Sequence, residues 1–252
     1  MIWGELLLAL RLRLCAQRLL ASGERDGSLW FYLPVAALLA LWMARGKLAA
    51  FARAGQVLLA VVVTAAAVVL GLALFQVRPE HLLPLWWQDA LPVAGGTLPV
   101  CGVLGWGMFA AFLLGQTEPA KHARRDWLIW SGIGCLLLSL EQLVVIGNLG
   151  ETLAQRLHSP FFALAKSVGV EGAFQRVESI VSALWIFGDL ALLGVILFAL
   201  WEMARTVWKK AEQKTVVTAA VLPAVIISMA AFPDGVGAEA AGRGIVLVGN
   251  LI

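Results

Sequence analysis

An acidic residue near the centre of a long apolar run is the first feature of this sequence that could do chemistry. Asp189 lies within the run 180–201, and Glu178 stands just before that run. Ser182 and Trp185 lie between the two acids at helical spacing, which places the four side chains on one helical face. A carboxylate at mid-membrane is costly unless it is paired, protonated or hydrated. We therefore expect Asp189 to face the protein interior, in a ligand or proton site or in a structural hydrogen bond.

A glycine-rich stretch could supply a binding site of a different kind. Residues 95–107 contain five Gly and one Pro, and both residue types weaken a continuous helix. The helix around residues 102–107 is therefore predicted to be interrupted or sharply bent. Backbone groups freed there could bind a ligand, as in transporters with broken helices, or the small residues could allow close helix packing. The candidate binding residues in this stretch are Gly102, Gly105, Trp106 and Gly107.

A second polar pair lies in the apolar run 127–150. Glu141 is the only charged residue of that run, and Asn148 follows it seven residues later on the same helical face. Both side chains are expected to face protein and not lipid. A ligand-binding role and a structural role remain open for this pair.

No catalytic, metal or cofactor site is predicted. The apolar runs contain no HExxH motif, no Ser/His/Asp cluster and no paired Asp motif. Cys15, Cys101 and Cys135 show neither CxxC nor Cys/His spacing, so a zinc site or a disulfide framework is not indicated. The net charge of +3 is small and is spread between the apolar runs, which argues against a nucleic-acid partner.

These residues must be positioned by membrane helices, because the composition excludes a soluble domain. Of the 252 residues, 61% are hydrophobic and 14% are charged, whereas a soluble domain has about 25% charged residues. The excess apolar surface must face lipid, so the expected partner of this all-α chain is the bilayer. Several of the 11 Trp residues stand at the ends of apolar runs, as interfacial anchors do.

Six runs are long and apolar enough to be predicted as transmembrane helices of a single domain. They are residues 28–44, 55–76, 98–115, 127–150, 180–201 and 216–232. Residues 1–21 are predicted to be the end part of a helix, and the apolar run after residue 244 is too short to span. The semi-polar stretch 151–176 is interpreted as one or two short helices on the extracytoplasmic membrane surface.

The distribution of Lys and Arg predicts the orientation of the chain. Three connections are rich in them and are expected in the cytoplasm, although the N-terminal segment, with four Arg, is an exception. These connections contain Arg45, Lys47 and Arg53; Lys121, Arg124 and Arg125; and Arg205, Lys209, Lys210 and Lys214.

Cysteine labelling tests this orientation. Lys47→Cys should react with a membrane-impermeant thiol reagent only when the reagent reaches the cytoplasmic face, since Lys47 lies in a positively charged connection. Labelling of this cysteine only from outside would reverse the assignment.

Several motifs follow one another in a characteristic order. Residues 42–55 read WMARGKLAAFARAG, residues 82–86 read LLPLW, and a Pro-initiated helix leads into a Phe-x-Arg-x-Glu-Ser segment and an early Trp. The residues of this last pattern are Pro160, Phe174, Arg176, Glu178, Ser179 and Trp185. From about residue 28 to 232 the chain resembles the spore germination permeases, which are the B subunits of germinant receptors in the amino acid–polyamine–organocation superfamily.

The resemblance implies a LeuT-like fold of ten helices in two inverted five-helix repeats. The six runs then correspond to helices four to nine, and residues 1–21 to the end of helix three, so we expect a form truncated at both ends. The family's cytoplasmic connections coincide with the three that are rich in Lys and Arg. The run 98–115 becomes one of the broken helices, and the run 180–201 becomes a helix that lines the central site.

The resemblance also implies a function. We expect a multi-pass subunit in the inner membrane of the spore, which senses a small nutrient such as an amino acid beside A and C receptor subunits. Two alternatives remain, namely a secondary transporter for amino acids or similar solutes, and a membrane scaffold or degenerate fragment without a ligand. An enzyme is not expected.

Overall fold

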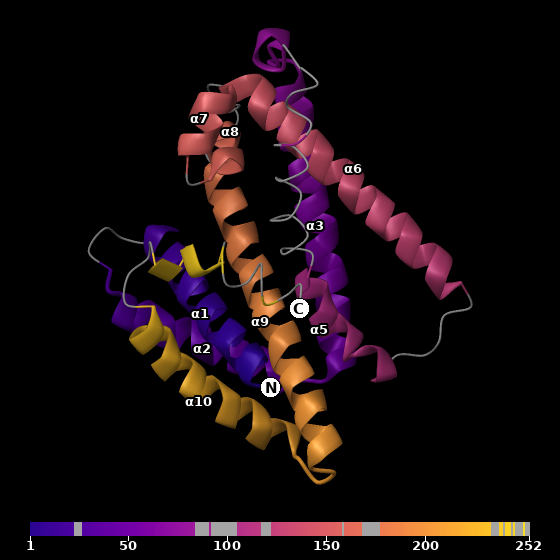
Figure 1. The fold of residues 1–252 in the computed structure, drawn as a ribbon, viewed down its shortest axis with the longest axis vertical. Helices are drawn as coiled ribbons and strands as arrows, with labels where there is room; N and C mark the ends of the chain where they lie inside the picture. Colours follow the sequence, from indigo (N-terminus) through magenta and orange to yellow (C-terminus); the bar gives the residue numbers. More distant parts are fainter. Residues whose placement is uncertain are drawn as a thin grey trace. The chain divides into compact units, whose positions relative to one another are not determined.

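The computed structural model describes residues 1–22, 27–83, 91, 105–116, 122–157, 159–167 and 177–232, and the single positions 237, 238, 240–242, 244 and 249. The regular elements in this part of the chain are all helical (Figure 1). They are α1 (Ile2–Ser22), α2 (Leu29–Ala44), α3 (Leu48–Leu74), η1 (Pro79–His81), η3 (Gly105–Gly107), α5 (Met108–Ala111), η4 (Leu114–Gln116), α6 (Ala123–Leu149), α7 (Glu151–Arg156), α8 (Pro160–Ser167), α9 (Val177–Val207) and α10 (Gln213–Ala231).

The chain divides into two compact units, which are described separately. Unit 1 comprises Met1–Leu58, Leu91–Thr117 and Trp185–Ile252, and unit 2 comprises Leu59–Ala90 and Glu118–Leu184. Helices α3 and α9 each contribute residues to both units.

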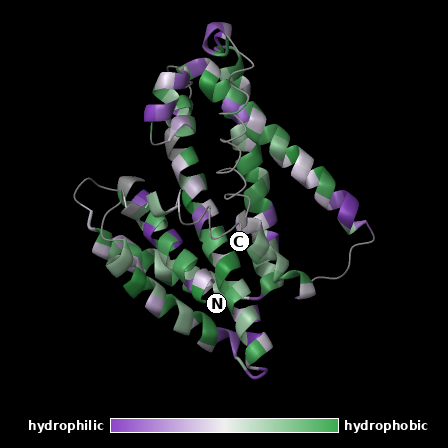
Figure 2. Ribbon diagram, viewed as in Figure 1, coloured by the Kyte–Doolittle hydropathy of each residue, from purple (hydrophilic) through white to green (hydrophobic). Residues whose placement is uncertain are grey.

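Among the described residues, four helices are long and apolar enough to cross a membrane, namely α3, α6, α9 and α10, and α2 is a shorter apolar helix. Their apolar character extends around the helices, while hydrophilic residues mark ends such as the start of α6 (Figure 2). Only 17% of the apolar window of α3 and 11% of that of α6 are buried by protein, against 50% for α9. Exposed apolar helices of this length require lipid around them, so the chain is a multi-pass membrane protein.

The observed helices follow the predicted runs in the same order along the chain, but several of them begin or end at other residues. The helix α2 coincides with the run 28–44, and the Ser28 hydroxyl caps it by accepting a hydrogen bond from the Trp30 backbone N–H at 3.3 Å. The helix α3 begins at Leu48, because nothing in 48–54 breaks a helix, and Arg53 lies on it. The helix α9 continues beyond 201 to Val207. The stretch 151–176 contains the two short helices α7 and α8.

The helix α1 is the centre of unit 1, although its arginines make it less apolar than the predicted spans. It packs against α2 and α10 (Figure 1). Its leucines and small residues point in all directions, and those at 7–10, 12, 15 and 16 are at most 3% exposed. Residues 1–21 are therefore a core element of the unit, where the sequence predicted only the end part of a helix.

The third predicted run does not form one continuous helix over its described part. Residues 105–116 form the 3₁₀ turn η3, the single turn α5 and the 3₁₀ turn η4. This confirms the predicted interruption for residues 105–107, while 98–104 lie outside the described residues. Phe109 and Trp106 anchor the segment, since both belong to the core that α1 shares with α9 and α10.

Two connections that are rich in Lys and Arg meet at one end of unit 1. The Gln213 side-chain amide donates to the carbonyls of Ala44 and Gly46, at 2.7 and 2.9 Å. The Arg45 guanidinium donates to the Thr218 hydroxyl at 2.9 Å. These bonds satisfy carbonyls at the C-terminal end of α2, and they place the connections after α2 and before α10 together.

In unit 2 a polar cluster fastens the C-terminal end of α6. The Asn148 amide donates to the carbonyls of Ala73 and Val144, at 3.1 and 2.8 Å. The Gly147 carbonyl accepts a hydrogen bond from the Arg78 backbone N–H at 2.9 Å. The apolar core around these bonds is formed by Leu70, Ala73, Val144, Val145 and Leu164. Asn148 therefore has a structural role, which is one of the two roles that the sequence left open.

Two glycines of α9 provide a matched test of packing in unit 1. A methyl group at Gly194 would lie 2.6 Å from Phe51 Cε2, and the Phe51 ring is held against Phe198 with its centroid 5.2 Å away. Gly194→Ala should lower the free energy of unfolding by about 1–3 kcal/mol through overpacking. Gly188→Ala meets no atom within 4 Å and should be neutral or stabilising. Thermal unfolding in detergent micelles compares the two, and equal midpoints would contradict the packing of α3 on α9 in this unit.

Candidate ligand-binding site

Asp189 lies in the interior of unit 1 and forms an ion pair with α1. The residue is 5% exposed, and its Oδ2 is 2.5 Å from Nη1 of Arg18. The Asp189 side chain is 6% exposed and that of Arg18 is 41% exposed, so the pair is open to its surroundings on the arginine side only. The predicted inward orientation of Asp189 is confirmed, and its partner comes from α1.

Two tryptophans flank the arginines of α1. The Arg18 guanidinium lies over the Trp185 ring, 5.5 Å from its centroid. Two helical turns nearer the N-terminus of α1, the Arg11 guanidinium lies over the Trp106 ring at 4.2 Å. Cation–π contacts of this kind stabilise a charge in a poorly hydrated place. Trp106 is only 7% exposed and belongs to the interrupted segment η3.

Arg11 and Arg18 act on the same carboxylate. They are seven residues apart and therefore share one face of α1. Both guanidinium groups interact electrostatically with Asp189. The site is thus a partly buried cluster of two cations and one anion, bordered by indole rings. Such a cluster suits the binding and orientation of a small polar solute, and contains no nucleophile paired with a base.

The predicted site residues are only partly brought together. Trp106 and Asp189 both contribute to the cluster in unit 1, and Gly105 and Gly107 form the turn that carries Trp106. Ser182 is half-buried on α9, two turns before Asp189, and Glu178 is part of α9 without a described side-chain position. Gly102 lies outside the described residues.

The structure also places three apolar side chains of α9, Glu141 and two arginines of α1. Leu190, Leu193 and Ile196 are at most 5% exposed, so these directions of α9 serve packing. Glu141 is half-buried on α6 in unit 2. Arg11 and Arg18 were missed, because charges within a segment of intermediate hydropathy resemble a membrane flank. Their spacing of seven on an otherwise leucine-rich face was the signal that could have identified them.

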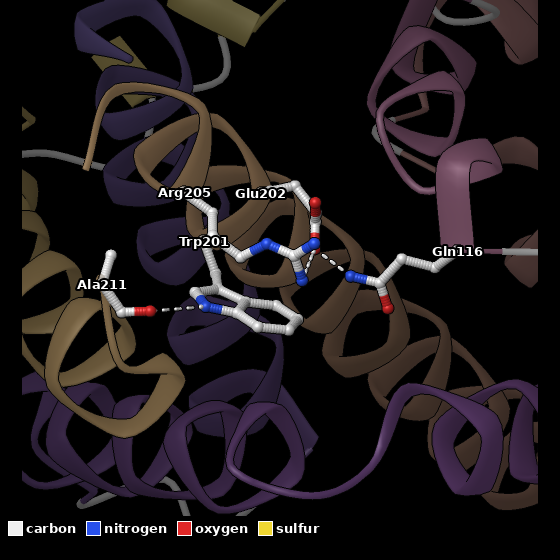
Figure 3. Close-up of polar contacts among 5 residues, drawn as sticks. All are labelled: Gln116, Trp201, Glu202, Arg205 and Ala211. Carbon is white, nitrogen blue, oxygen red and sulfur yellow. Dashed lines mark hydrogen bonds and ion pairs between the residues drawn. The ribbon is translucent and has the colours of Figure 1, made fainter. Parts of the chain in front are cut away.

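A second polar cluster lies at the far end of α9 (Figure 3). The Gln116 amide of η4 donates to Glu202 Oε1, and Nη1 of Arg205 is 3.3 Å from the same oxygen. The Trp201 indole N–H donates to the Ala211 carbonyl at 3.4 Å, and the Arg205 guanidinium lies over the Trp201 ring. These contacts fasten the end of the interrupted segment to α9, next to the connection that precedes α10.

Metal chemistry has no support in the described part of the chain. No group of three or more His, Cys, Asp or Glu side chains there is close enough to hold a metal ion. Cys15 lies on α1 between Arg11 and Arg18 and is fully buried as a free thiol. The cluster around Asp189 therefore consists of charged side chains and aromatic rings.

The fold and the cluster define a helical multi-pass membrane protein with paired charges in its interior. The sequence matches the spore germination protein family over residues 10–234, and the chain belongs to that family. No curated protein and no solved structure shows significant similarity to the chain.

Replacement of Asp189 tests its role in the cluster. Asp189→Leu leaves Arg18 without its partner, and breaking a fully buried pair costs about 3–5 kcal/mol. Because the Arg18 side chain is 41% exposed, we expect a smaller loss, about 1–3 kcal/mol of unfolding free energy. Asp189→Asn keeps a hydrogen-bond acceptor and should lose less. Glu212→Gln, at an exposed acid, is the control and should change stability by less than about 0.5 kcal/mol. A leucine variant as stable as the wild type would show that the pair is not formed.

Proposed function

We propose that this chain is a membrane subunit of a nutrient germinant receptor and that it senses a small solute such as an amino acid. Two facts support the proposal. The chain belongs to the spore germination protein family, and it holds charged and aromatic side chains in the interior of an apolar helical unit. The observation that carries the proposal is the juxtaposition of the Arg18–Asp189 pair with the Arg11–Trp106 contact.

The proposed ligand site combines this cluster with the interrupted segment. Gly102, Gly105, Trp106 and Gly107 would supply free backbone groups, and Asp189 would orient a polar group of the solute. Ser182 and Glu178 would extend the polar face of α9. An irregular backbone beside buried charges is the arrangement that membrane transport proteins use to replace the water around a solute.

The proposal extends to the fold and to the partners. We propose that the chain adopts part of a LeuT-like inverted repeat, with its six apolar runs as helices four to nine, and that A and C receptor subunits assemble with it in the inner membrane of the spore. The connections that contain Lys47, Arg124 and Lys209 would face the cytoplasm. The hydrogen bonds of Gln213 to Ala44 and Gly46 support a common side for two of these connections.

A secondary transporter is the alternative that a specific observation favours. The turns η3, α5 and η4 break the third run, and such breaks accompany alternating access in transporters. A sensor could use the same break to transmit binding without carrying the solute across.

Proteoliposomes that contain the full chain separate these functions. A ¹⁴C-labelled mixture of amino acids should bind saturably without accumulating in the lumen if the chain is a receptor subunit. Accumulation beyond the bound amount would favour the transporter, and the absence of both would favour a scaffold and contradict the proposal. Asp189→Asn should reduce binding about tenfold or more, as expected for loss of a charge-assisted contact. Glu212→Gln, at an exposed acid, should bind like the wild type.

A further inference from the structure

The environment of Arg11 shows a positive charge that the described protein does not neutralise. In the described part of the chain, the ion pair of Asp189 is made with Arg18, and Arg11 forms none. The Nε atom of Arg11 is buried without a hydrogen-bond partner. A buried guanidinium without a counter-charge is costly in any apolar interior.

The neighbouring ionisable groups do not remove this imbalance. Arg11 interacts favourably with the charge of Asp189 and unfavourably with the like charge of Arg18, and Arg18 is the residue that pairs with the carboxylate. Glu5 contacts the backbone of Ala224 on α10, and its position lies about 240° around α1 from Arg11 at about 100° per residue. On the face of α1 that carries Arg11 and Arg18, two cations therefore share one anion, which leaves an excess of one positive charge on this face. The third arginine of the helix, Arg13, is buried on another face, about 200° from Arg11.

The Arg11 guanidinium lies over the Trp106 ring of the interrupted segment, with Cζ 4.2 Å from the ring centroid. The N–H groups of a guanidinium point outward in its plane, so its edge is able to bind an oxyanion with two parallel hydrogen bonds. Arg11 is only partly buried, although its Nε atom is inaccessible, so the two Nη groups are the donors that a small solute would meet. The adjacent turn Gly105–Gly107 has no side chain at Gly107 to obstruct the approach.

We propose that the edge of the Arg11 guanidinium binds the carboxylate of the small ligand, with Trp106 holding the guanidinium in place. The inference rests on the proposed nutrient-binding function and adds the side chain that binds the carboxylate of the ligand. A single carboxylate matches the excess of one positive charge, whereas a phosphate dianion would replace it with an excess of negative charge.

Competition binding to the purified full chain in nanodiscs tests the proposal. The probe is the ¹⁴C-labelled amino-acid mixture, displaced by unlabelled amino acids, by the corresponding amino-acid amides, or by inorganic phosphate. We expect the acids to compete at least about tenfold better than the amides, and Arg11→Gln to weaken binding about 10- to 100-fold. Arg11→Lys keeps the charge without the two parallel N–H groups and should fall between.

Arg205→Gln is the matched control, because Arg205 also lies over an indole ring but has Glu202 as its ion-pair partner. This variant should bind the probe like the wild type. The ligand-free Arg11→Gln protein loses its contact with Trp106, as Arg205→Gln loses its contact with Trp201, so its unfolding midpoint should be no lower than that of Arg205→Gln. A midpoint clearly below that of Arg205→Gln would indicate a structural arginine and overturn the proposal.

The remaining outcomes separate a failure of the carboxylate assignment from a failure of the proposed nutrient-binding function. Saturable binding that is equal for acids and amides, that phosphate displaces equally well, or that survives Arg11→Gln would overturn the carboxylate assignment and leave the nutrient-binding function intact. Absence of binding by every amino acid in the wild-type chain would overturn both.

Discussion

A charge inside a membrane protein must be compensated, and this requirement determines how unit 1 is put together. Asp189 is nearly fully buried on α9, and the Arg18 guanidinium on α1 compensates it at 2.5 Å. The pair constrains the rotation of α1, because the face that carries Arg11 and Arg18 must turn toward α9. Leucines fill most of the other directions, and Arg13 is buried on another face. Without a partner, either charge would be unfavourable in this environment. A helix with four charged residues can therefore lie at the centre of the unit.

The interrupted segment is positioned by the same helix. Trp106 lies against Arg11, and Phe109 belongs to the shared core, so the start of the segment is fixed by the arginine face of α1. Its end is fixed by the contact of Gln116 with Glu202 on α9. Between these anchors the backbone forms single turns. A change of charge at Arg11 therefore acts on a segment whose two ends are held by different helices.

Much of this architecture could be predicted from the sequence. Length and hydropathy are local properties, and they located α2, α3, α6, α9 and α10 to within a few residues at most ends. The helical spacing around Asp189 correctly predicted that this carboxylate faces inward, and the glycines predicted the break at residues 105–107.

The remaining features depend on tertiary contacts that no local pattern contains. The arginines of α1 lower its hydropathy, so a criterion based on apolar runs could not identify it as a core helix. The partner of Asp189 is 171 residues away in the sequence, and Asn148 is tied to a carbonyl 75 residues away. Charge spacing within α1 suggests that Arg11 and Arg18 share a face, but only the packing of α1 against its neighbours shows that this face meets a buried acid.

A double-mutant cycle across Arg18 and Asp189 tests the central claim most directly. The unfolding free energies of the wild type, Arg18→Gln, Asp189→Asn and the double variant would be measured in the same detergent. A direct ion pair predicts a coupling energy of at least about 1 kcal/mol, with the double variant more stable than the sum of the single losses implies. Additivity within about 0.3–0.5 kcal/mol would show that the two side chains do not interact, and would contradict the arrangement of α1 against α9.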